Sequence, residues 1–67
     1  MLGKNLASER IKRRMTIKAF ANFLGISPST LFSWENGANP RNPEQLRDIS
    51  KRLNLPLYYL IFKEKES

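Results

Sequence analysis

Apolar residues recur along the chain at the three- and four-residue spacing of helices, in short blocks separated by residues typical of helix ends. In the clearest block, four apolar residues share one helical face: Ile17, Phe20, Ala21 and Leu24. Thr16 precedes this block and Gly25 follows it, and these residue types favour the N-cap and the C-terminal end of a helix. The pattern predicts a helix between these two residues.

The next block starts only two residues after this stop. Ser27 is a second N-cap candidate, Pro28 suits the first position of a helix, and Gly37 ends the block. We therefore expect a helix from about Pro28 to Asn36, joined to the preceding helix by a tight turn. Its inward pair is Leu31 and Trp34. Two short helices joined in this way either present the second helix to a DNA groove or pack as an ordinary helical hairpin, and the spacing alone leaves both alternatives open.

The N-terminal block predicts a first helix over residues 5–14. Its apolar arc holds Leu6, Ala7 and Ile11. Arg10 falls inside the same arc, so its charge needs a partner if this side of the helix is buried.

Two further helices complete the predicted set. Asn42 is a cap candidate and Gln45 stands at the third helical position, which indicates the start of a fourth helix that ends near Asn54. A short last helix follows over residues 57–62. No strand-like alternation occurs, so the expected fold class is all-α.

Length and composition exclude several classes of protein. The chain has 67 residues, no Cys and no His, which removes disulfide frameworks, Cys or His zinc sites and His-based catalytic triads. No apolar run reaches the roughly 18–20 residues of a membrane span, and no signal peptide is evident. We expect one non-enzymatic cytoplasmic domain over 1–67, with frayed ends at 1–4 and 63–67 and without a metal, cofactor or small-molecule ligand.

The charge favours a polyanionic partner. Lys and Arg outnumber Asp and Glu by 12 to 6, and the first 34 residues alone hold six bases and one acid. Nucleic acid, an anionic membrane surface and simple solubility are each compatible with this excess.

One set of residues matches a known pattern: Arg10, Thr16, Ala21, Leu24-Gly25-Ile26-Ser27, Ser29-Thr30-Leu31 and Trp34-Glu35-Asn36-Gly37. With Leu53, Leu55 and Leu60 at matching distances, the chain over 6–62 resembles the lambda-repressor-like, Cro-type helix-turn-helix family, also called the xenobiotic-response-element type. The resemblance implies a five-helix DNA-binding domain with the helix-turn-helix at the second and third helices. It further implies a prokaryotic or phage transcriptional regulator that binds double-stranded DNA at the nucleoid. We expect a repressor that binds a near-palindromic operator as a dimer.

The resemblance also implies roles for individual residues. It pairs Arg10 with Glu35, which supplies the partner that Arg10 needs. The base-facing residues would be Pro28, Ser29, Thr30, Phe32 and Ser33. The phosphate-facing residues would be Ile17 through its backbone N–H, Lys18, Asn36, Asn39 and Arg41.

The third helix departs from the family pattern, in which longer polar readers often stand at positions 28 and 33. Pro28 and Phe32 can offer only apolar contact, to thymine methyl groups. The hydroxyls of Ser29 and Ser33 can serve base edges or phosphates, or they are simple surface polarity. No bidentate reader of guanine or adenine is visible on this helix, so specificity is modest or rests on DNA shape, water and flanking contacts.

The last predicted helix is too apolar for the free end of a monomer. Three of its residues suffice for the core, which leaves Tyr58, Tyr59 and Phe62 for a protein contact, unless one or two of these rings thicken the core. The resemblance adds that such repressors dimerise through this edge, so we expect a homodimer. Two other functions stay open: an antitoxin-like or anti-repressor subunit that binds DNA weakly, and a nonspecific binder of nucleic acid or anionic surfaces.

Overall fold

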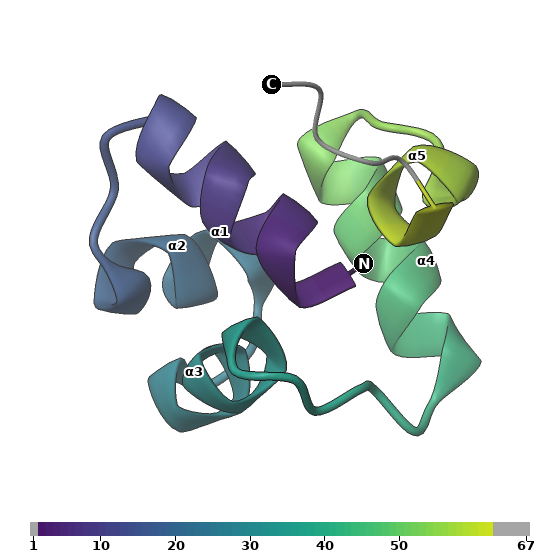
Figure 1. Cartoon of the computed structure of the whole chain (residues 1–67), viewed down its shortest axis with the longest axis horizontal. Coiled ribbons are helices and arrows are strands. Elements are labelled where there is room, and N and C mark those ends of the chain that lie inside the picture. The colour runs from purple at the N-terminus through teal and green to yellow at the C-terminus, as the bar shows by residue number, and fades with distance from the viewer. Residues whose placement is uncertain (1, 63–67) are drawn as a thin grey trace.

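The computed structural model describes residues 2–62, which form five α-helices and no strand (Figure 1). The helices are α1 (Leu2–Lys12), α2 (Ile17–Leu24), α3 (Pro28–Glu35), α4 (Pro43–Leu53) and α5 (Leu57–Phe62). The expected all-α fold is therefore confirmed. Met1 and residues 63–67, for which we expected frayed ends, lie outside the described part of the chain. None of the helices between residues 2 and 62 is long and apolar enough to cross a membrane.

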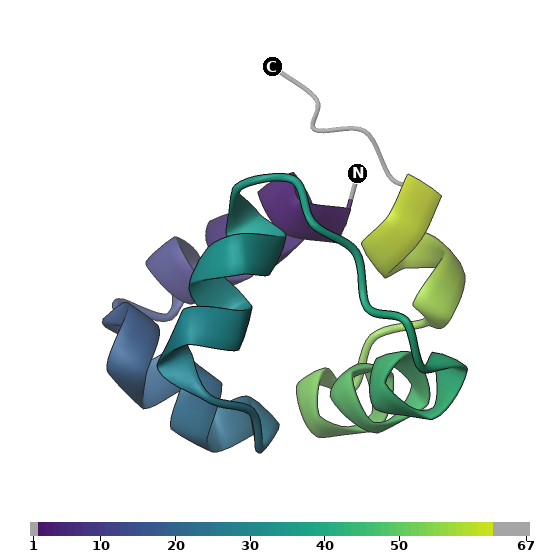
Figure 2. The ribbon, with the colours of Figure 1, turned by 90° about the horizontal axis from the view of Figure 1, so that it is seen from below.

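The helices form two groups that face each other. α1, α2 and α3 lie on one side of the molecule, and α4 and α5 lie on the other (Figures 1 and 2). The segment between α3 and α4 runs across from one group to the other (Figure 2). α5 packs beside the start of α1, so the two ends of the described chain are neighbours in space.

The core lies between the two groups and draws on all five helices. Its buried apolar residues are Leu2, Leu6, Phe20, Ala21, Leu24, Leu31, Trp34, Ile49, Leu53 and Leu60. Burying each large apolar side chain contributes about 1.5–3 kcal/mol, which offsets the entropy lost when the chain is ordered. Phe20 of α2 and Leu31 of α3 are fully shielded from solvent, so these two helices are held together by their inner faces.

Local caps determine where α2 and α3 begin and end. The Thr16 Oγ1 accepts a hydrogen bond from the Ala19 N–H at 3.1 Å, and the Ser27 Oγ accepts one from the Thr30 N–H at 3.2 Å. Gly25 ends α2 in the left-handed conformation, with a φ of 79° that a residue without a Cβ adopts at little cost. These caps place α2 where it was predicted, and α3 ends at Glu35, one residue before the predicted end.

α1 differs from the prediction in both its bounds and its buried face. It spans Leu2–Lys12 instead of 5–14, so residues 2–4, for which we expected a frayed end, are helical. Ile11, which we expected inside, is 65% exposed. The buried positions are Leu2, Asn5, Leu6 and Glu9, which also follow helical spacing but include two polar residues that a search for apolar positions passes over.

Both buried polar side chains of α1 have partners. The Asn5 Nδ2 donates to the Leu60 carbonyl oxygen at 2.6 Å and to the Tyr59 carbonyl oxygen at 3.3 Å. The Glu9 carboxylate accepts from Arg13 and, at 3.4 Å, from the Lys12 Nζ. Because each buried polar group is bonded, its burial carries no large desolvation penalty, and Asn5 attaches α5 to α1.

Candidate nucleic-acid interface

The turn between α2 and α3 is built from backbone hydrogen bonds that follow from Gly25. The Ile26 N–H donates to the Ala21 carbonyl oxygen at 3.0 Å, and the Gly25 N–H donates to the Asn22 carbonyl oxygen at 3.2 Å. This pattern closes α2, and α3 starts after Ser27 in a new direction. Two eight-residue helices thus cross with their inner faces in contact, while the outer face of α3 is left to solvent.

An ion pair holds the far end of α3 against α1. The Arg10 Nε donates to the Glu35 Oε2 at 2.9 Å, and the Arg10 Nη2 donates to the Glu35 Oε1 at 3.1 Å. A third bond joins the Arg10 Nη1 to the Met15 carbonyl oxygen at 3.2 Å. Only 20% of the Arg10 side chain and 8% of the Glu35 side chain are exposed. The arc that carries Arg10 is thus partly buried, and the charge on it is neutralised by Glu35.

The outer face of α3 carries four of the five side chains that we predicted to face bases. Pro28, Ser29, Phe32 and Ser33 are exposed, and the Phe32 side chain is exposed to 56%. Thr30 is half-buried. The opposite face of the helix is buried through Leu31 and Trp34.

The hydroxyl groups at the start of α3 bond to one another. The Ser27 Oγ donates to the Thr30 Oγ1 at 2.8 Å, in addition to accepting from the Thr30 N–H. The Ser29 Oγ lies 3.4 Å from the Ser27 Oγ. At the other end, the Asn36 Nδ2 donates to the Phe32 carbonyl oxygen at 2.8 Å. Thr30 and Asn36, both predicted DNA contacts, therefore also stabilise the two ends of the helix.

The predicted phosphate contacts lie at two places. Asn36, Asn39 and Arg41 are exposed and follow one another along the segment after α3. Lys18 is exposed in the first turn of α2, where backbone N–H groups without intrahelical partners favour an anion. Ile17, whose predicted role was through its backbone N–H, is half-buried.

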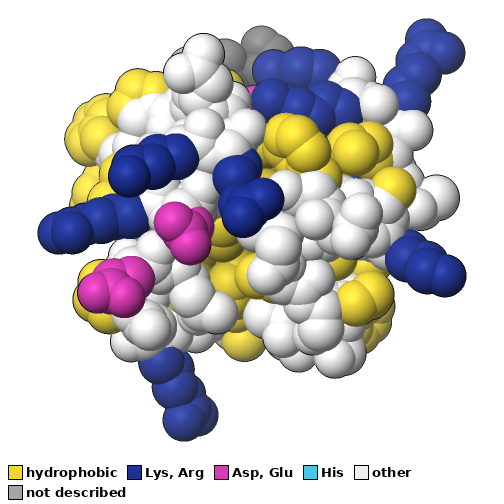
Figure 3. All heavy atoms as spheres, turned by 180° about the vertical axis from the view of Figure 1, so that it is seen from behind, with side chains coloured by type: hydrophobic (Ala, Val, Ile, Leu, Met, Phe, Trp, Pro, Cys, Tyr) yellow, Lys and Arg dark blue, Asp and Glu magenta, His cyan; other side chains and the backbone are white. Residues whose placement is uncertain are grey.

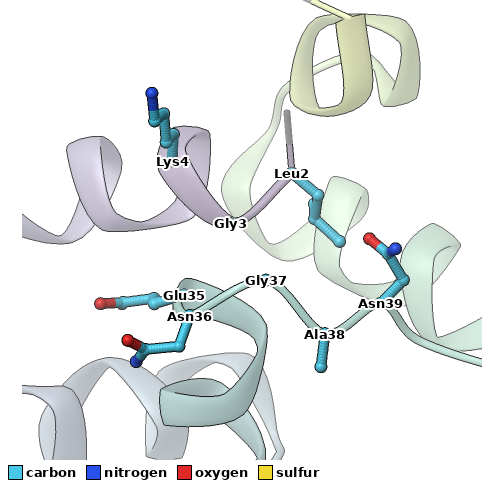
Figure 4. Close-up of a pocket in the computed structure, with 8 residues that line it drawn as sticks. All are labelled: Leu2, Gly3, Lys4, Glu35, Asn36, Gly37, Ala38 and Asn39. Carbon is cyan, nitrogen blue, oxygen red and sulfur yellow. The ribbon is translucent and has the colours of Figure 1, made fainter.

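A hollow separates the start of α1 from the segment after α3. It is lined by Leu2, Gly3, Lys4, Glu35, Asn36, Gly37, Ala38 and Asn39 (Figure 4). Leu2 points into the hollow, whereas Lys4 and Asn36 point away from it (Figure 4). The hollow therefore gathers no set of converging charged groups. Within residues 2–62, no cluster of His, Cys, Asp or Glu is placed to hold a metal ion.

Positive charge is spread over the face shown in Figure 3 and does not mark one patch of it. On the face shown in Figure 3, Lys and Arg side chains stand around the rim and near the centre, and the acidic side chains lie together on one side. Charge alone thus does not locate the nucleic-acid interface. The exposed face of α3, the second helix of the motif, remains the predicted interface.

The C-terminal aromatic residues differ in exposure: Tyr58 and Phe62 are exposed, and Tyr59 is half-buried. Tyr58 is 72% exposed and Phe62 is 62% exposed, and their rings form a tilted pair with centroids 5.3 Å apart. Tyr59 is half-buried, and its backbone carbonyl accepts from Asn5. An apolar hollow adjoins Phe62 and is lined by Leu2, Asn39, Pro40, Leu46, Ile61 and Phe62. The sequence pattern did not reveal this hollow, because its walls come from four separate segments.

A capped helix, a glycine turn and a second helix with an exposed outer face define a helix-turn-helix domain. The chain belongs to the lambda-repressor/Cro-like helix-turn-helix family, whose model, described as Helix-turn-helix, matches residues 6–60. Members of this family are DNA-binding transcription regulators and generally not enzymes. Neither the curated proteins nor the solved structures gave a significant match.

Proposed function

We propose that the chain represses transcription by binding a near-palindromic operator in double-stranded DNA as a homodimer. The family supplies DNA binding and transcription regulation. The observation that supports DNA binding by this chain is the outer face of α3, which is exposed to solvent while the rest of the helix is held in place. Leu31 and Trp34 anchor the inner face, Ser27 caps one end, and the Arg10–Glu35 ion pair holds the other. A single helix of this kind fits a major groove about 12 Å wide.

In this proposal one set of residues contacts bases and another contacts phosphates. Base edges are contacted by Pro28, Ser29, Thr30, Phe32 and Ser33. Phosphates are contacted by the Ile17 N–H, Lys18, Asn36, Asn39 and Arg41. Phosphate contacts hold the helix in register, and only the contacts to bases distinguish one sequence from another.

The dimer is proposed from α5. Tyr58 and Phe62 form an exposed pair of rings, Phe62 lines an apolar hollow, and Tyr59 is half-buried. Exposed aromatic residues next to an apolar surface are typical of protein contacts. To bind two half-sites one turn of DNA apart, a symmetric dimer would have to hold its two α3 helices about 34 Å apart.

The test is a selection from randomised duplex DNA with the purified protein near physiological salt. We expect enrichment of an inverted repeat whose half-sites are centred about one helical turn apart. A pool that stays random although DNA is retained would leave only electrostatic binding, and it would overturn sequence-specific regulation. The stoichiometry of the complex on one operator tests the dimer separately.

The same rings support one alternative. The exposed Tyr58–Phe62 pair and its neighbouring hollow would equally suit a subunit that binds a different protein and contacts DNA weakly, as in an antitoxin-like or anti-repressor protein. A stable complex with another chain, together with no enrichment of any DNA sequence, would favour this alternative over the repressor.

A further inference from the structure

The outer face of α3 offers few polar groups that can identify a base pair. Bidentate contacts to guanine or adenine come from Arg, Lys, Asn or Gln, and none of these occurs between Pro28 and Glu35. Glu35 is the only charged residue in this helix, and both of its carboxylate oxygens accept from Arg10.

The hydroxyl groups at the start of the helix and within it add little capacity to distinguish base pairs. Ser27, Ser29 and Thr30 are linked at 2.8 and 3.4 Å, and Ser27 also caps the helix. The Ser27 hydroxyl donates to Thr30, so the Ser29 hydroxyl is the donor in the 3.4 Å contact, and the accepting Thr30 side chain is half-buried. Ser33, one turn after Ser29, is exposed, but it carries one short hydroxyl. A single hydroxyl discriminates weakly between bases, because it can both donate and accept.

Phe32 is the distinctive group on this face. It lies in the middle of α3, its side chain is 56% exposed, and no other large hydrophobic residue of the helix is exposed. Apart from Pro28, its exposed neighbours on the helix are short polar side chains, so the ring does not belong to an extended apolar patch of the size that marks a protein contact. In the major groove, the apolar group that a base pair presents is the C5-methyl of thymine.

We infer that α3 selects DNA through the C5-methyl groups of thymine, with the Phe32 ring as the principal contact. Pro28 lies one turn earlier on the same side of the helix and extends the apolar strip toward a neighbouring base pair. Because this contact requires α3 to lie in a major groove, the inference rests on the proposed function. It predicts that each selected half-site contains thymine at the positions α3 faces. It also predicts that methylation of cytosine at C5 can replace thymine there.

The test separates the methyl group from the hydrogen-bonding edge of the base pair. At each thymine of the selected operator, binding is measured with four pairs: T·A, U·A, C·G and 5-methyl-C·G. The affinity should follow the methyl group, so U·A binds about fourfold more weakly than T·A for each half-site, or roughly 15-fold for two. The pair 5-methyl-C·G should bind more tightly than C·G by the same factor.

Variants then assign the methyl effect to the ring. Phe32→Ala should bind T·A and U·A operators equally, while Ile11→Ala, which removes an exposed apolar side chain of α1, should keep the wild-type difference. Unchanged melting temperatures will show that both variants fold. An enriched half-site without thymine, or a methyl effect that persists in Phe32→Ala, overturns the inference and leaves the proposed function standing. A pool that stays random overturns both.

Discussion

Arg10 and Glu35 lie 25 positions apart in the sequence and meet in a bidentate ion pair, with bonds of 2.9 Å and 3.1 Å between α1 and the last residue of α3. The pair is mostly shielded from solvent, and Arg10 also bonds the Met15 carbonyl oxygen in the segment that leads into α2. The Arg10 side chain therefore links α1 to the end of α3 and to the segment that leads into α2. The orientation of α3 depends on this link as well as on the core.

Removal of one partner should be strongly destabilising. Arg10→Met leaves the Glu35 carboxylate largely buried without its counter-ion, and we expect the free energy of unfolding to fall by about 3 kcal/mol. Urea denaturation followed by helix circular dichroism measures this change. Arg47→Met, at an exposed position of α4, is the matched control and should change stability by less than about 0.5 kcal/mol. Equal stability of the two variants would contradict a structural role for the pair.

Substitution of Arg14 by Gly should stabilise the domain. It adopts a left-handed conformation with a φ of 59° after α1, a position at which Gly or Asn is favoured, as Gly25 and Asn54 illustrate after α2 and α4. Arg14→Gly relieves this strain at the cost of a more flexible unfolded chain, and we expect a net gain of about 0.5–1 kcal/mol. Lys12→Gly, at the last helical residue of α1, should lose up to about 1 kcal/mol. Thermal denaturation of both variants should give shifts of opposite sign.

Gly3 should tolerate no side chain. A Cβ built at Gly3 would stand 2.2 Å from the Trp34 carbonyl oxygen, so the start of α1 would have to move away from the end of α3. We expect Gly3→Ala to destabilise the domain by about 1–3 kcal/mol, as overpacking does elsewhere. Lys4→Ala alters the exposed neighbouring position and should be nearly neutral. Equal melting temperatures for the two variants would mean that α1 and α3 are not in contact there.

Affinity for DNA should fall steeply with salt. Lys18 and Arg41 of two subunits supply four charged phosphate contacts, so the logarithm of the binding constant should fall with the logarithm of the salt concentration with a slope of about −4. Lys18→Ala removes one contact from each subunit and should make the slope shallower by about 2. Ser33→Ala, proposed to face a base, should weaken binding without changing the slope. A slope that Lys18→Ala leaves unaltered would remove Lys18 from the phosphate contacts.

The dimer should be sensitive to the exposed rings of α5. Tyr58→Ser combined with Phe62→Ser removes two side chains that are 72% and 62% exposed, so we expect folding to be kept and self-association to weaken by at least tenfold. Sedimentation equilibrium measures the association. Ile11→Ser, which is also 65% exposed but lies on α1, should leave association unchanged. If the double variant associates like the wild type, the interface lies elsewhere.

The helix-turn-helix itself could be predicted because its determinants are local. The Thr16 side chain caps a residue three positions away, Ser27 does the same, and Gly25 ends α2 through bonds to the preceding turn. Hydrogen bonds of this range depend on residue type and spacing, which can be read along the chain. The exposed face of α3 follows from the same periodicity once Leu31 and Trp34 are recognised as its inner pair.

The buried side of α1 could not be predicted in the same way. Asn5 is buried because it bonds backbone carbonyls of α5 more than 50 positions away, and Glu9 is buried under Lys12 and Arg13. Ile11 would fit a core equally well, but the fold turns it to solvent. Hydrophobicity ranks such positions wrongly, because the cost of burying a polar group depends on its partners, and those of Asn5 are brought near only by the folded chain.

The sequence by itself determined the caps, the turn, the bounds of α2, the start of α3, and the family to which the chain belongs. Only the tertiary structure decided which side of α1 is buried, that residues 2–4 are helical, and that Tyr59 is partly covered while Tyr58 and Phe62 are exposed. The two kinds of feature differ in the sequence separation of the contacts that determine them. Caps and turns depend on hydrogen bonds between residues a few positions apart. Burial is settled by contacts between α1 and α5, whose relative placement no local pattern records.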